Sequence, residues 1–337
     1  MSRTPYIFLD GDSRLSSRPA TKYFISLLVL IGFFFIAVPF FQESKAETNR
    51  DYVEEVALPL PAYIEPGSVS PPFEAFYNCV RPKLAPLVGS YDEFWFSFVN
   101  LTKECDDLEA YRGIDLRAAV NRDEVKHVAY PRKVVESLVM SEDLTMVTFG
   151  IGQDVSAELA LKEMYPRFEF YGVDPSSYIN QNIFEKDLGG KYFEYAISGH
   201  EGMQNTRVNR KGGYREEVTK TIGADVFFAE IVQKKKIDVL WMDVEGHEYP
   251  ILNQLHHNGA LDKRGVVICQ MHVEMHKDNF KESQGETKKF HDFVWKVLED
   301  RRYIMLKPVF VRFKSKRYIR TFILNVADKE CTDLFLI

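Results

Sequence analysis

Residues 145–156 read Thr-Met-Val-Thr-Phe-Gly-Ile-Gly-Gln-Asp-Val-Ser, a short apolar run followed at once by two glycines. The apolar run is typical of a buried strand, and the amphipathic segment after it predicts a helix. Gly150 and Gly152 would let the backbone turn tightly and approach a ligand closely, and Asp154 or Ser156 can cap the new helix. The stretch predicts a strand, a glycine loop and a helix, although such a glycine pair is also common in ordinary turns.

An acidic residue follows the next predicted strand. Residues 171–175 read Tyr-Gly-Val-Asp-Pro, and Asp174 lies 22 residues after Gly152. At a spacing of roughly 20 residues, a second-strand acid binds the ribose hydroxyls of a nucleoside cofactor. A dinucleotide site would have glycine or alanine where this chain has Val155. S-adenosylmethionine has no pyrophosphate and fits these residues better. The alternative is that Asp174 and Pro175 simply form a turn.

From about residue 131 onward, β-branched or aromatic runs alternate with amphipathic segments. This alternation predicts an α/β fold with a parallel sheet covered by helices on both faces, spanning 131–337. The last two runs predict an antiparallel hairpin at the sheet edge. Residues 73–130 are expected to form a mainly helical lead-in. The expected strands are 145–149, 168–173, 191–197, 237–242, 265–271, 302–311 and 317–326, and the expected helices are 155–165, 176–188, 248–258 and 285–300.

Residues 237–248 read Ile-Asp-Val-Leu-Trp-Met-Asp-Val-Glu-Gly-His-Glu, an apolar strand that ends in acids and a histidine. Packing alone does not favour charged side chains at the end of a buried strand. Ligands bind at the carboxyl edge of an open α/β sheet, so we expect Asp243, Glu245 and His247 to face the same crevice as the glycine loop. The alternative is that Asp243 and Glu245 cap the following helix.

His272, Glu274 and His276 recur at every second position near the end of the fifth expected strand. If that strand continues, alternation places all three on one face. Together with Asp243 they could ligate a divalent metal ion, since two histidines and a carboxylate are a known ligand set. Polar strand ends in this kind of sheet contact the acceptor more often than a metal. We therefore assign no metal and keep His272 as a candidate catalytic residue.

The motifs at 150–156, 171–175 and 238–248 together resemble the FkbM-type branch of S-adenosylmethionine-dependent methyltransferases, in particular the membrane-anchored forms that nematodes carry. The resemblance covers about residues 125–328, and its most specific part is the Asp-Val-Glu-Gly-x-Glu block. It implies a class I, Rossmann-like fold with a mostly parallel, seven-stranded sheet. It also implies S-adenosylmethionine as the cofactor and O-methylation, with sugar and polyketide hydroxyls among the acceptors of the wider family.

The resemblance also implies roles for the glycine loop and its neighbours. Gly150 and Gly152 would line the cofactor, Asp174 would bind its ribose, and we group Asp154 with these cofactor residues. Many such enzymes have an acid two residues before the first glycine, where this chain has Thr148. That departure keeps open a weaker hold on the methionine end of the cofactor, or an inactive relative.

Methyl transfer to a hydroxyl requires a general base within hydrogen-bond reach of the acceptor. The resemblance places Asp243 and Glu245 at the border of the acceptor site. We expect Asp243 to orient the acceptor and His247 or Glu245 to act as the base. His272 is the rival for that role.

Residues 23–41 carry no charge and are about long enough to cross a bilayer. Basic residues dominate before this segment and acids after it, so the positive-inside rule leaves 1–22 cytosolic. The Pro- and acid-rich segment 42–72 is expected to be a stem. We therefore expect a type II membrane protein of the Golgi or endoplasmic reticulum with a lumenal domain. The alternative is a signal peptide cleaved near Ser44-Lys45-Ala46.

The Asn100-Leu101-Thr102 sequon agrees with a lumenal domain, although a single sequon is a weak signal. In an oxidising lumen Cys79 and Cys105 are candidates for a disulfide. Two buried unpaired thiols are the alternative.

The composition is that of a folded protein, with 45% hydrophobic and 27% charged residues. The net charge of −6 disfavours nucleic acid as the main partner. We expect an S-adenosylmethionine-dependent O-methyltransferase that acts in the secretory lumen on a sugar hydroxyl of a glycan. Alternatives are a non-catalytic lumenal binding protein with the same fold, and an enzyme acting on a lipid or small molecule at the membrane. Nothing in the sequence specifies an oligomeric state.

Overall fold

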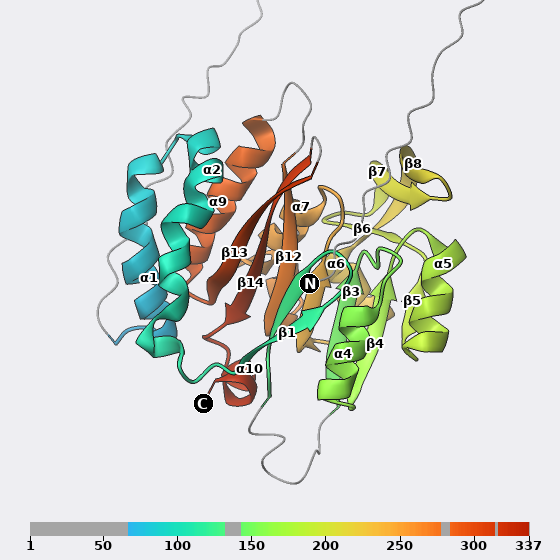
Figure 1. The fold of residues 1–337 in the computed structure, drawn as a ribbon, viewed down its shortest axis with the longest axis horizontal. Helices are drawn as coiled ribbons and strands as arrows, with labels where there is room; N and C mark the ends of the chain where they lie inside the picture. The colour runs from blue at the N-terminus through green and yellow to red at the C-terminus, as the bar shows by residue number, and fades with distance from the viewer. Residues whose placement is uncertain (1–66, 132–142, 278–283, 314–315, 337) are drawn as a thin grey trace, which may run out of the picture. The chain divides into compact units, whose positions relative to one another are not determined.

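The computed structural model describes residues 67–131, 143–277, 284–313 and 316–336 (Figure 1). The expected cytosolic tail 1–22 and membrane segment 23–41 lie outside these ranges, as does most of the expected stem. Among the described residues, no helix combines the length and the apolar character that a membrane span requires.

The last residues assigned to the stem belong instead to the first helix. Helix α1 (Pro71–Leu84) begins with Pro71 and Pro72. Proline is tolerated in the first turn because the N–H groups there have no helical acceptor. Helix α1 packs against α2 (Tyr91–Thr102), and both contact the outermost strand of the central sheet.

The central sheet has seven strands in the order β13-β14-β12-β10-β3-β4-β5 (Figure 1). Neighbours from β12 to β5 run parallel, while β14 is antiparallel to both β12 and β13. The expected mostly parallel, seven-stranded sheet and its C-terminal hairpin are thus confirmed. The strands are β3 (Leu144–Phe149), β4 (Phe168–Val173), β5 (Lys191–Phe193), β10 (Val239–Met242), β12 (Gln270–Lys277), β13 (Tyr303–Phe313) and β14 (Lys316–Asn325).

Three expected strands are interrupted, one of them the strand predicted over 265–271, which divides at Cys269. The strand predicted over 191–197 divides because the chain leaves the central sheet after Phe193 and pairs elsewhere. The strand predicted over 237–242 divides at Asp238, whose carboxylate accepts the Thr145 N–H at 2.8 Å. The short strands that result are β6 (Ala196–Ser198), β9 (Lys236–Ile237) and β11 (Val267–Ile268), the partner of β9.

Two antiparallel hairpins were not predicted. One occupies the end of the lead-in that was expected to be mainly helical, and it packs against β12, β14 and α4. The other pairs with β6 in a separate three-stranded sheet. Both consist largely of polar or exposed residues, so they lack the regular apolar alternation of a half-buried strand. The hairpins are β1 (Leu116–Val120) with β2 (Val125–Ala129), and β7 (Gly202–Arg210) with β8 (Gly213–Gly223).

Helices cover both faces of the sheet, with α4 in front of it and α6 and α7 behind it in Figure 1. The helix predicted over 176–188 begins as an α-helix and continues as a π-helix, Ile183–Asp187. The remaining helices are α4 (Ser156–Met164), α5 (Ser177–Asn182), α6 (Ala224–Val226), α7 (Glu248–Leu252), α8 (Ala260–Lys263), α9 (Gln284–Asp300) and α10 (Lys329–Phe335).

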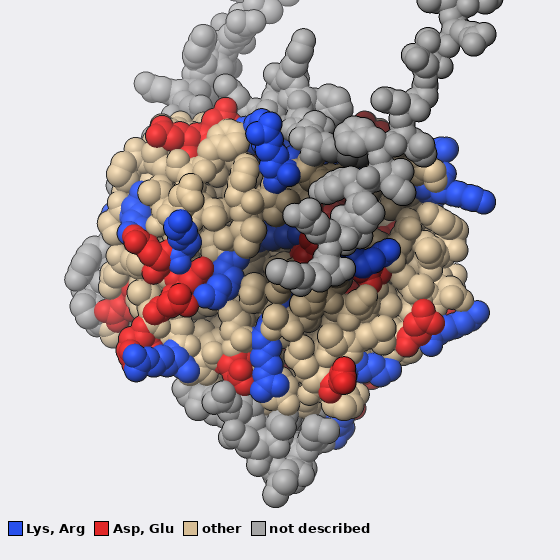
Figure 2. Space-filling model, in the orientation of Figure 1, with Lys and Arg blue, Asp and Glu red and all other residues tan. Residues whose placement is uncertain are grey.

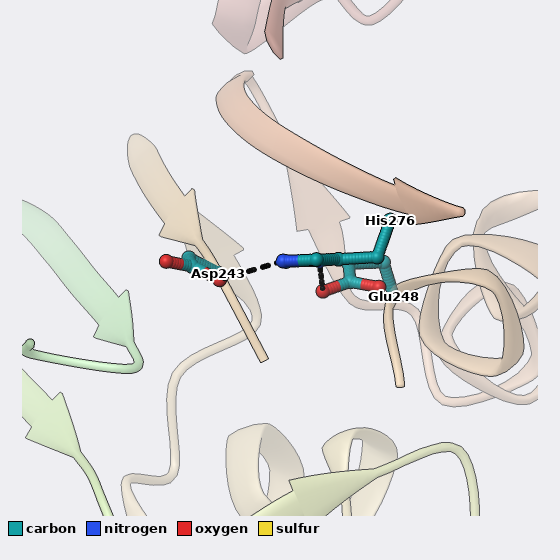
Figure 3. A group of neighbouring side chains, drawn as sticks. All are labelled: Asp243, Glu248 and His276. Carbon is teal, nitrogen blue, oxygen red and sulfur yellow. Dashed lines mark hydrogen bonds and ion pairs between the residues drawn. The ribbon is translucent and has the colours of Figure 1, made fainter. Parts of the chain in front are cut away.

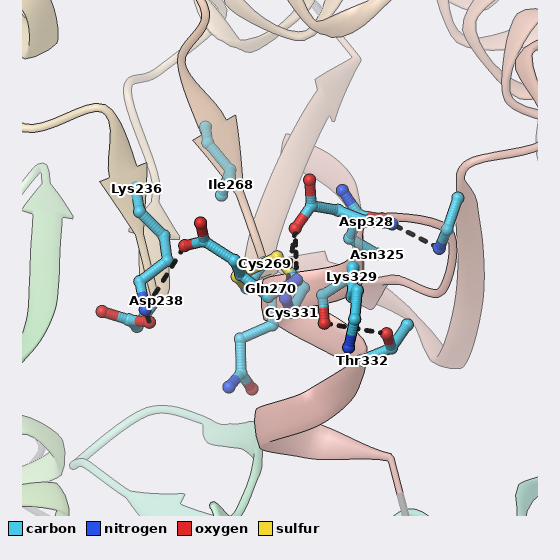
Figure 4. The surroundings of a disulfide bond; sticks show 12 residues. Lys236, Asp238, Ile268, Cys269, Gln270, Asn325, Asp328, Lys329, Cys331 and Thr332 are labelled. Atoms are coloured by element: carbon cyan, nitrogen blue, oxygen red, sulfur yellow. Dashed lines mark hydrogen bonds and ion pairs between the residues drawn. A yellow bond between two sulfur atoms is a disulfide. The ribbon is translucent and has the colours of Figure 1, made fainter. Parts of the chain in front are cut away.

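Two disulfides pair the four cysteines. Cys79 is bonded to Cys105, which was one of the two alternatives left open by the sequence. Cys269 is bonded to Cys331, a pairing that was not predicted (Figure 4). This second bond joins the residue before β12 to helix α10, whose first turn is capped by the Asp328 side chain. The C-terminal helix is thus tied covalently to the central sheet.

Candidate functional site

The loop between β3 and α4 depends on its two glycines. Gly150 has φ +81°, and a Cβ there would lie 1.8 Å from the carbonyl oxygen of Asp243. Gly152 has φ +66°, and a Cβ there would point into open space. Both are left-handed conformations that other residues rarely adopt. Gly150 therefore packs the loop against the end of β10, whereas the space beside Gly152 is available to a ligand.

Asp174, directly after β4, holds the same loop. Its Oδ2 accepts the Ile151 N–H at 3.0 Å, and its Oδ1 accepts the Ser176 N–H at 2.7 Å. Burial raises the pKa of this carboxyl, and the hydrogen bonds oppose that shift. The Asn180 side chain and the Gly152 N–H also bond this carboxylate, which lies at the edge of a pocket beside the loop.

A pocket lies between the glycine loop, the end of β10 and the β6–β8–β7 sheet. We call it the apolar pocket, because apolar and aromatic side chains form much of its wall. Its lining includes Gly150, Gly152, Val173, Asp174, Pro175, Tyr195, Ala196, Ile197, Val208, Tyr214, Asp243, Val244, Glu245 and His247.

A second pocket lies on the other side of the glycine loop, under the turn between β1 and β2. We call it the charged pocket. It shares Gly150, Gly152, Tyr214 and Asp243 with the apolar pocket, so the two are continuous along the loop. Its other lining residues are Asn121, Arg122, Asp123, Glu124, Lys126, Thr148, Ile151, Asp154 and Glu158.

Asp154 lines the charged pocket with both carboxylate oxygens in use. Oδ2 accepts hydrogen bonds from the backbone N–H and the Nε of Arg122, each at 3.0 Å. Oδ1 accepts the Ser156 N–H at 3.0 Å. Burial raises the pKa of this carboxyl, but the hydrogen bonds from Ser156 and Arg122 outweigh that effect and lower it to about 2. Asp154 therefore connects the β1–β2 turn to the start of α4.

Glu248 shapes the loop that follows β10. Its Oε1 accepts the Val244 N–H at 3.1 Å, and its two oxygens accept the Gly246 N–H at 3.2 and 3.1 Å. The same carboxylate lies 2.9 Å from Nδ1 of His276, at the end of β12 (Figure 3). A fully buried acid thus joins the loop to the neighbouring strand.

The His276 ring lies between acids on both sides. Its Nδ1 donates to Glu248, and its Nε2 donates to Glu274 Oε1 at 3.2 Å. Nε2 also lies 3.9 Å from Asp243 Oδ1 (Figure 3). Burial lowers the pKa of His276, but the neighbouring carboxylates, Glu248 foremost, raise it well above its ordinary value. We therefore treat His276 as an imidazolium.

Asp243 has a different environment. Its Oδ1 is buried and has no hydrogen-bond partner, while the side chain borders both pockets. Burial, and then repulsion from Glu274, raise the pKa of this carboxyl well above the ordinary value. A carboxylate with a raised pKa is a better proton acceptor than an ordinary one.

Glu245 and His247 lie beside the apolar pocket and both have partners. Glu245 accepts hydrogen bonds from Lys316 Nζ at 2.9 and 2.8 Å. His247 Nε2 donates to the Asn205 carbonyl at 3.2 Å, and its Nδ1 lies 3.0 Å from Ser198 Oγ. Both residues also line a neighbouring polar groove, which we call the outer groove, formed by Asn205, Thr206, Arg207, Glu216, Glu245, Gly246, His247, His276, Lys277 and Lys316.

The structure brings two of the residues considered for a metal ion, Asp243 and His276, together with Glu248. These three could each offer one ligand atom, all within 4.8 Å of one another. Glu248, however, is committed to backbone N–H groups and to His276, and both ring nitrogens of His276 donate to acids. Hydrogen bonds and ion pairs therefore account for this group.

His272 does not reach the site, and its expected part in catalysis is corrected here. The β1–β2 hairpin covers this part of β12. His272 Nδ1 accepts the His127 N–H at 3.4 Å, and its Nε2 donates to Glu124 at 3.2 Å. Burial lowers the pKa of this histidine, which lines none of the three cavities. It supports the hairpin instead.

Several residues of the site were missed by the sequence analysis. Tyr214 and Arg207 come from the β7–β8 hairpin, and Lys126 comes from β2. Glu158 was also missed, although it follows Asp154 by four residues, the spacing that places two residues on one face of a helix.

A family model described as the methyltransferase FkbM domain matches residues 88–305, well over half of the chain. A search of curated protein sequences finds no match.

Solved structures that resemble this one include several methyltransferases. TrmK of M. capricolum, solved with S-adenosylhomocysteine, is 13% identical, with a TM-score of 0.31, covering 58% of this chain and 70% of that one. Magnesium protoporphyrin IX methyltransferase (ChlM) of Synechocystis PCC 6803 is 9% identical, with a TM-score of 0.29, covering 58% and 75%. A mutant 16S rRNA (adenine(1408)-N(1))-methyltransferase of Catenulisporales acidiphilia is 11% identical, with a TM-score of 0.29, covering 64% and 98%.

Proposed function

Because this chain belongs to the FkbM methyltransferase family, we propose that it transfers the methyl group of S-adenosylmethionine to a hydroxyl oxygen of a glycan in the lumen of the secretory pathway. The methyltransferase family and its cofactor are the premise. The oxygen acceptor, the glycan and the compartment are the proposal.

The residues at the sheet edge fit the cofactor. The open space beside Gly152 lets a ligand approach the backbone, and the Asp174 carboxylate lines the same pocket, where a ribose hydroxyl could exchange for one of its present hydrogen-bond partners. Tyr195, Ile197 and Val208 give the apolar pocket a wall suited to an adenine ring. When bound, S-adenosylmethionine supplies a methyl group on a sulfonium, and displacement of the thioether in line with the nucleophile completes the transfer.

The position and basicity of Asp243 carry the proposal of oxygen methylation. This side chain lies where the two pockets meet, and its buried Oδ1 has no hydrogen-bond partner. The other candidate bases already have hydrogen-bond partners, since Glu245 pairs with Lys316 and His247 is hydrogen-bonded through both ring nitrogens. We therefore assign the general base to Asp243, rather than the orienting role first expected.

Asp243 would take the proton of the acceptor hydroxyl while the oxygen attacks the methyl carbon. The protonated carboxyl would then return its proton to solvent. The nearby imidazolium of His276 stabilises the ionised form of Asp243 before transfer. The base and its supporting charge thus belong to adjacent strands of a rigid sheet.

A polyhydroxylated acceptor suits the outer groove. Its lining is almost entirely polar, with Arg207, Glu216 and Lys316 among the groups available for hydrogen bonds. Tyr214 is 46% exposed at the edge of the neighbouring pocket, where Arg207 and Lys316 lie over its ring. On the face drawn in Figure 2, the described basic and acidic side chains are interspersed, unlike the continuous basic surface that a polyphosphate acceptor favours.

The lumenal assignment is supported by the cysteines and by the apolar segment 23–41. All four cysteines form disulfides, which persist in oxidising compartments and are rare in the cytosol. The sequon residue Asn100 is exposed on α2, where a glycan could be attached.

The test is methylation of glycans by the full-length protein in detergent with isotopically labelled S-adenosylmethionine. We expect label on released sugars, and the Asp243→Asn variant is expected to lower kcat by about 10²- to 10⁴-fold, the usual contribution of a general base. Asp187→Asn, at an exposed acid away from the three cavities, is the matched control.

Cofactor binding without label on any glycan would reject the glycan and favour a lipid or small-molecule acceptor, tested in the same assay. Full activity of Asp243→Asn would remove Asp243 as the base. Failure of the wild-type protein to bind cofactor would favour the non-catalytic alternative.

A further inference from the structure

Glu158 is a buried acid that the mechanism above does not use. It lies in the first turn of α4 and is 2% exposed. Its Oε1 accepts a hydrogen bond from Thr148 Oγ1 at 2.9 Å, and its side chain lines the charged pocket. Acids are almost never buried to this extent without a partner of opposite charge.

No cation within the described residues forms an ion pair with Glu158. Lys126 is the nearest candidate and is itself buried, but its Nζ is bonded to Glu124. Arg122, which also lines the pocket, is bonded to Asp154. The described residues place no Lys, Arg or His nitrogen within 4.0 Å of the Glu158 carboxylate.

The ion pairs of the pocket single out Glu158. Asp123 and Glu124 pair with Arg320, Asp154 pairs with Arg122, and Asp243 lies 3.9 Å from His276. Glu158 is the most deeply buried acid of this lining, and among the described residues it is the one without such a pair. The pocket is therefore suited to a ligand group that brings positive charge and N–H donors.

The charged pocket lies where one end of the cofactor is expected to bind. S-adenosylmethionine has a nucleoside at one end and an amino acid with an ammonium and a carboxylate at the other. The apolar pocket suits the nucleoside, and the charged pocket continues from it past Gly150, Gly152 and Asp243. An extended cofactor with its nucleoside in the apolar pocket would place its amino acid end beside Glu158.

We propose that the carboxylate of Glu158, held by Thr148, binds the ammonium group of the cofactor's amino acid end. This assignment rests on the proposed function. It also gives Thr148 a role, since the acid expected at that position is replaced by an acid from helix α4 that Thr148 orients. The departure of this chain from its family at position 148 would then not imply a lost cofactor site.

Binding of an ammonium group at Glu158 predicts a particular pH dependence. Burial raises the pKa of the Glu158 carboxyl to about 7, opposed by Lys126 on β2, while Asp154 at the start of α4 adds to the increase. Ammonium binding requires the ionised carboxylate. Affinity should therefore fall by about tenfold for each pH unit below 7, and only for ligands that carry the ammonium.

The experiment measures equilibrium binding of two probes to the full-length protein in detergent, between pH 5.5 and 8.5. S-adenosylhomocysteine carries the amino acid end, and 5′-methylthioadenosine lacks it. We expect Glu158→Gln to weaken S-adenosylhomocysteine binding by 10- to 100-fold at pH 8 and to leave 5′-methylthioadenosine binding unchanged. Glu163→Gln, at an exposed acid on the same helix, is the matched control.

The outcomes separate this inference from the proposed function. If the wild-type protein binds neither probe, the proposed function fails. If it binds both and Glu158→Gln weakens neither or both equally, the function stands and the role of Glu158 is overturned. Should Glu158→Gln fail to fold, the wild-type pH profiles decide, because equal pH dependence for the two probes contradicts ammonium binding at Glu158.

Discussion

Glu248 illustrates how a single side chain can set the geometry of the proposed acceptor side. It holds two backbone N–H groups of the loop after β10 and also bonds His276 on the adjacent strand. Burial raises the pKa of Glu248, but His276 and the hydrogen bonds outweigh that effect and lower it. The two residues therefore form a buried, charged pair whose energy depends on both protonation states.

The pair predicts a window of pH for stability. Glu248 has a pKa below its ordinary 4.5, so its contribution is complete above about pH 4.5 and is lost as the pH falls further. His276 has a pKa above its ordinary 6.5, so its contribution is complete below about pH 6.5 and is lost as the pH rises. The pair should stabilise the protein most between these two values.

We expect His276→Gln to lower the free energy of unfolding by about 3–5 kcal/mol within that window, and by less on either side. Urea unfolding of the variant and the wild-type protein from pH 4 to 9 measures the difference. His257→Gln, at an exposed histidine, is the control. A loss that does not vary with pH would show that the pair is not charged as described.

At the scale of elements, the parts that the sequence pattern could predict are those built mainly of buried apolar residues. Strands β3 and β4 and the C-terminal hairpin match their expected ranges closely, because most of their residues are apolar, aromatic or β-branched. The sequence therefore also predicted where β3, β4 and β10 end, and with those ends it predicted the positions of Gly150, Asp174 and Asp243. The polar hairpins β1–β2 and β7–β8 left no such signal, although they form one wall of each pocket.

Contacts distant in the sequence account for the other missed residues. Glu158 can be recognised as a site residue only when its position beside Thr148 and under the β1–β2 turn is known. His276 can be recognised only when β12 is known to continue to Lys277. His272 shows the converse, because alternation placed it near His276 but could not reveal the hairpin that covers it.

The β3–α4 loop makes a prediction about its two glycines. Gly152→Ala should cost about 1–2 kcal/mol of stability for its left-handed backbone and weaken S-adenosylhomocysteine binding by more than tenfold, because the methyl group enters the space left for the ligand. Gly150→Ala should abolish folding, since its Cβ would overlap the Asp243 carbonyl. Circular dichroism and equilibrium binding measure the two effects. Equal stability of both variants would contradict this distinction.

At the scale of the whole molecule, the disulfides fix the two regions that flank the family core. Cys79–Cys105 closes the helical lead-in, and Cys269–Cys331 fastens α10 beneath β12 (Figure 4). The Cys269 N–H donates to the Ile237 carbonyl at 2.8 Å, and its carbonyl accepts the Asn325 N–H at 2.7 Å. The second disulfide is thus anchored in the backbone network at the base of the sheet.

Loop length predicts which bond matters more. The sequence separations are 62 for Cys269–Cys331 and 26 for Cys79–Cys105. Chain entropy gives about 4.3 kcal/mol for the longer loop and about 3.5 kcal/mol for the shorter one, because the loss of unfolded-state entropy grows with the logarithm of loop length. Cys269→Ala with Cys331→Ala should therefore destabilise the protein more than Cys79→Ala with Cys105→Ala.

Urea unfolding of both double variants, with and without a reducing agent, tests this order and the proposed compartment together. In oxidising buffer the wild-type protein should be the most stable of the three. Reduction should lower it below either variant measured in oxidising buffer, because the reduced protein has lost both bonds and each oxidised variant has lost one. If reduction leaves its unfolding midpoint unchanged, the disulfides are not formed in the isolated protein. The cysteines would then no longer support a lumenal enzyme, and the apolar segment 23–41 alone would carry that assignment.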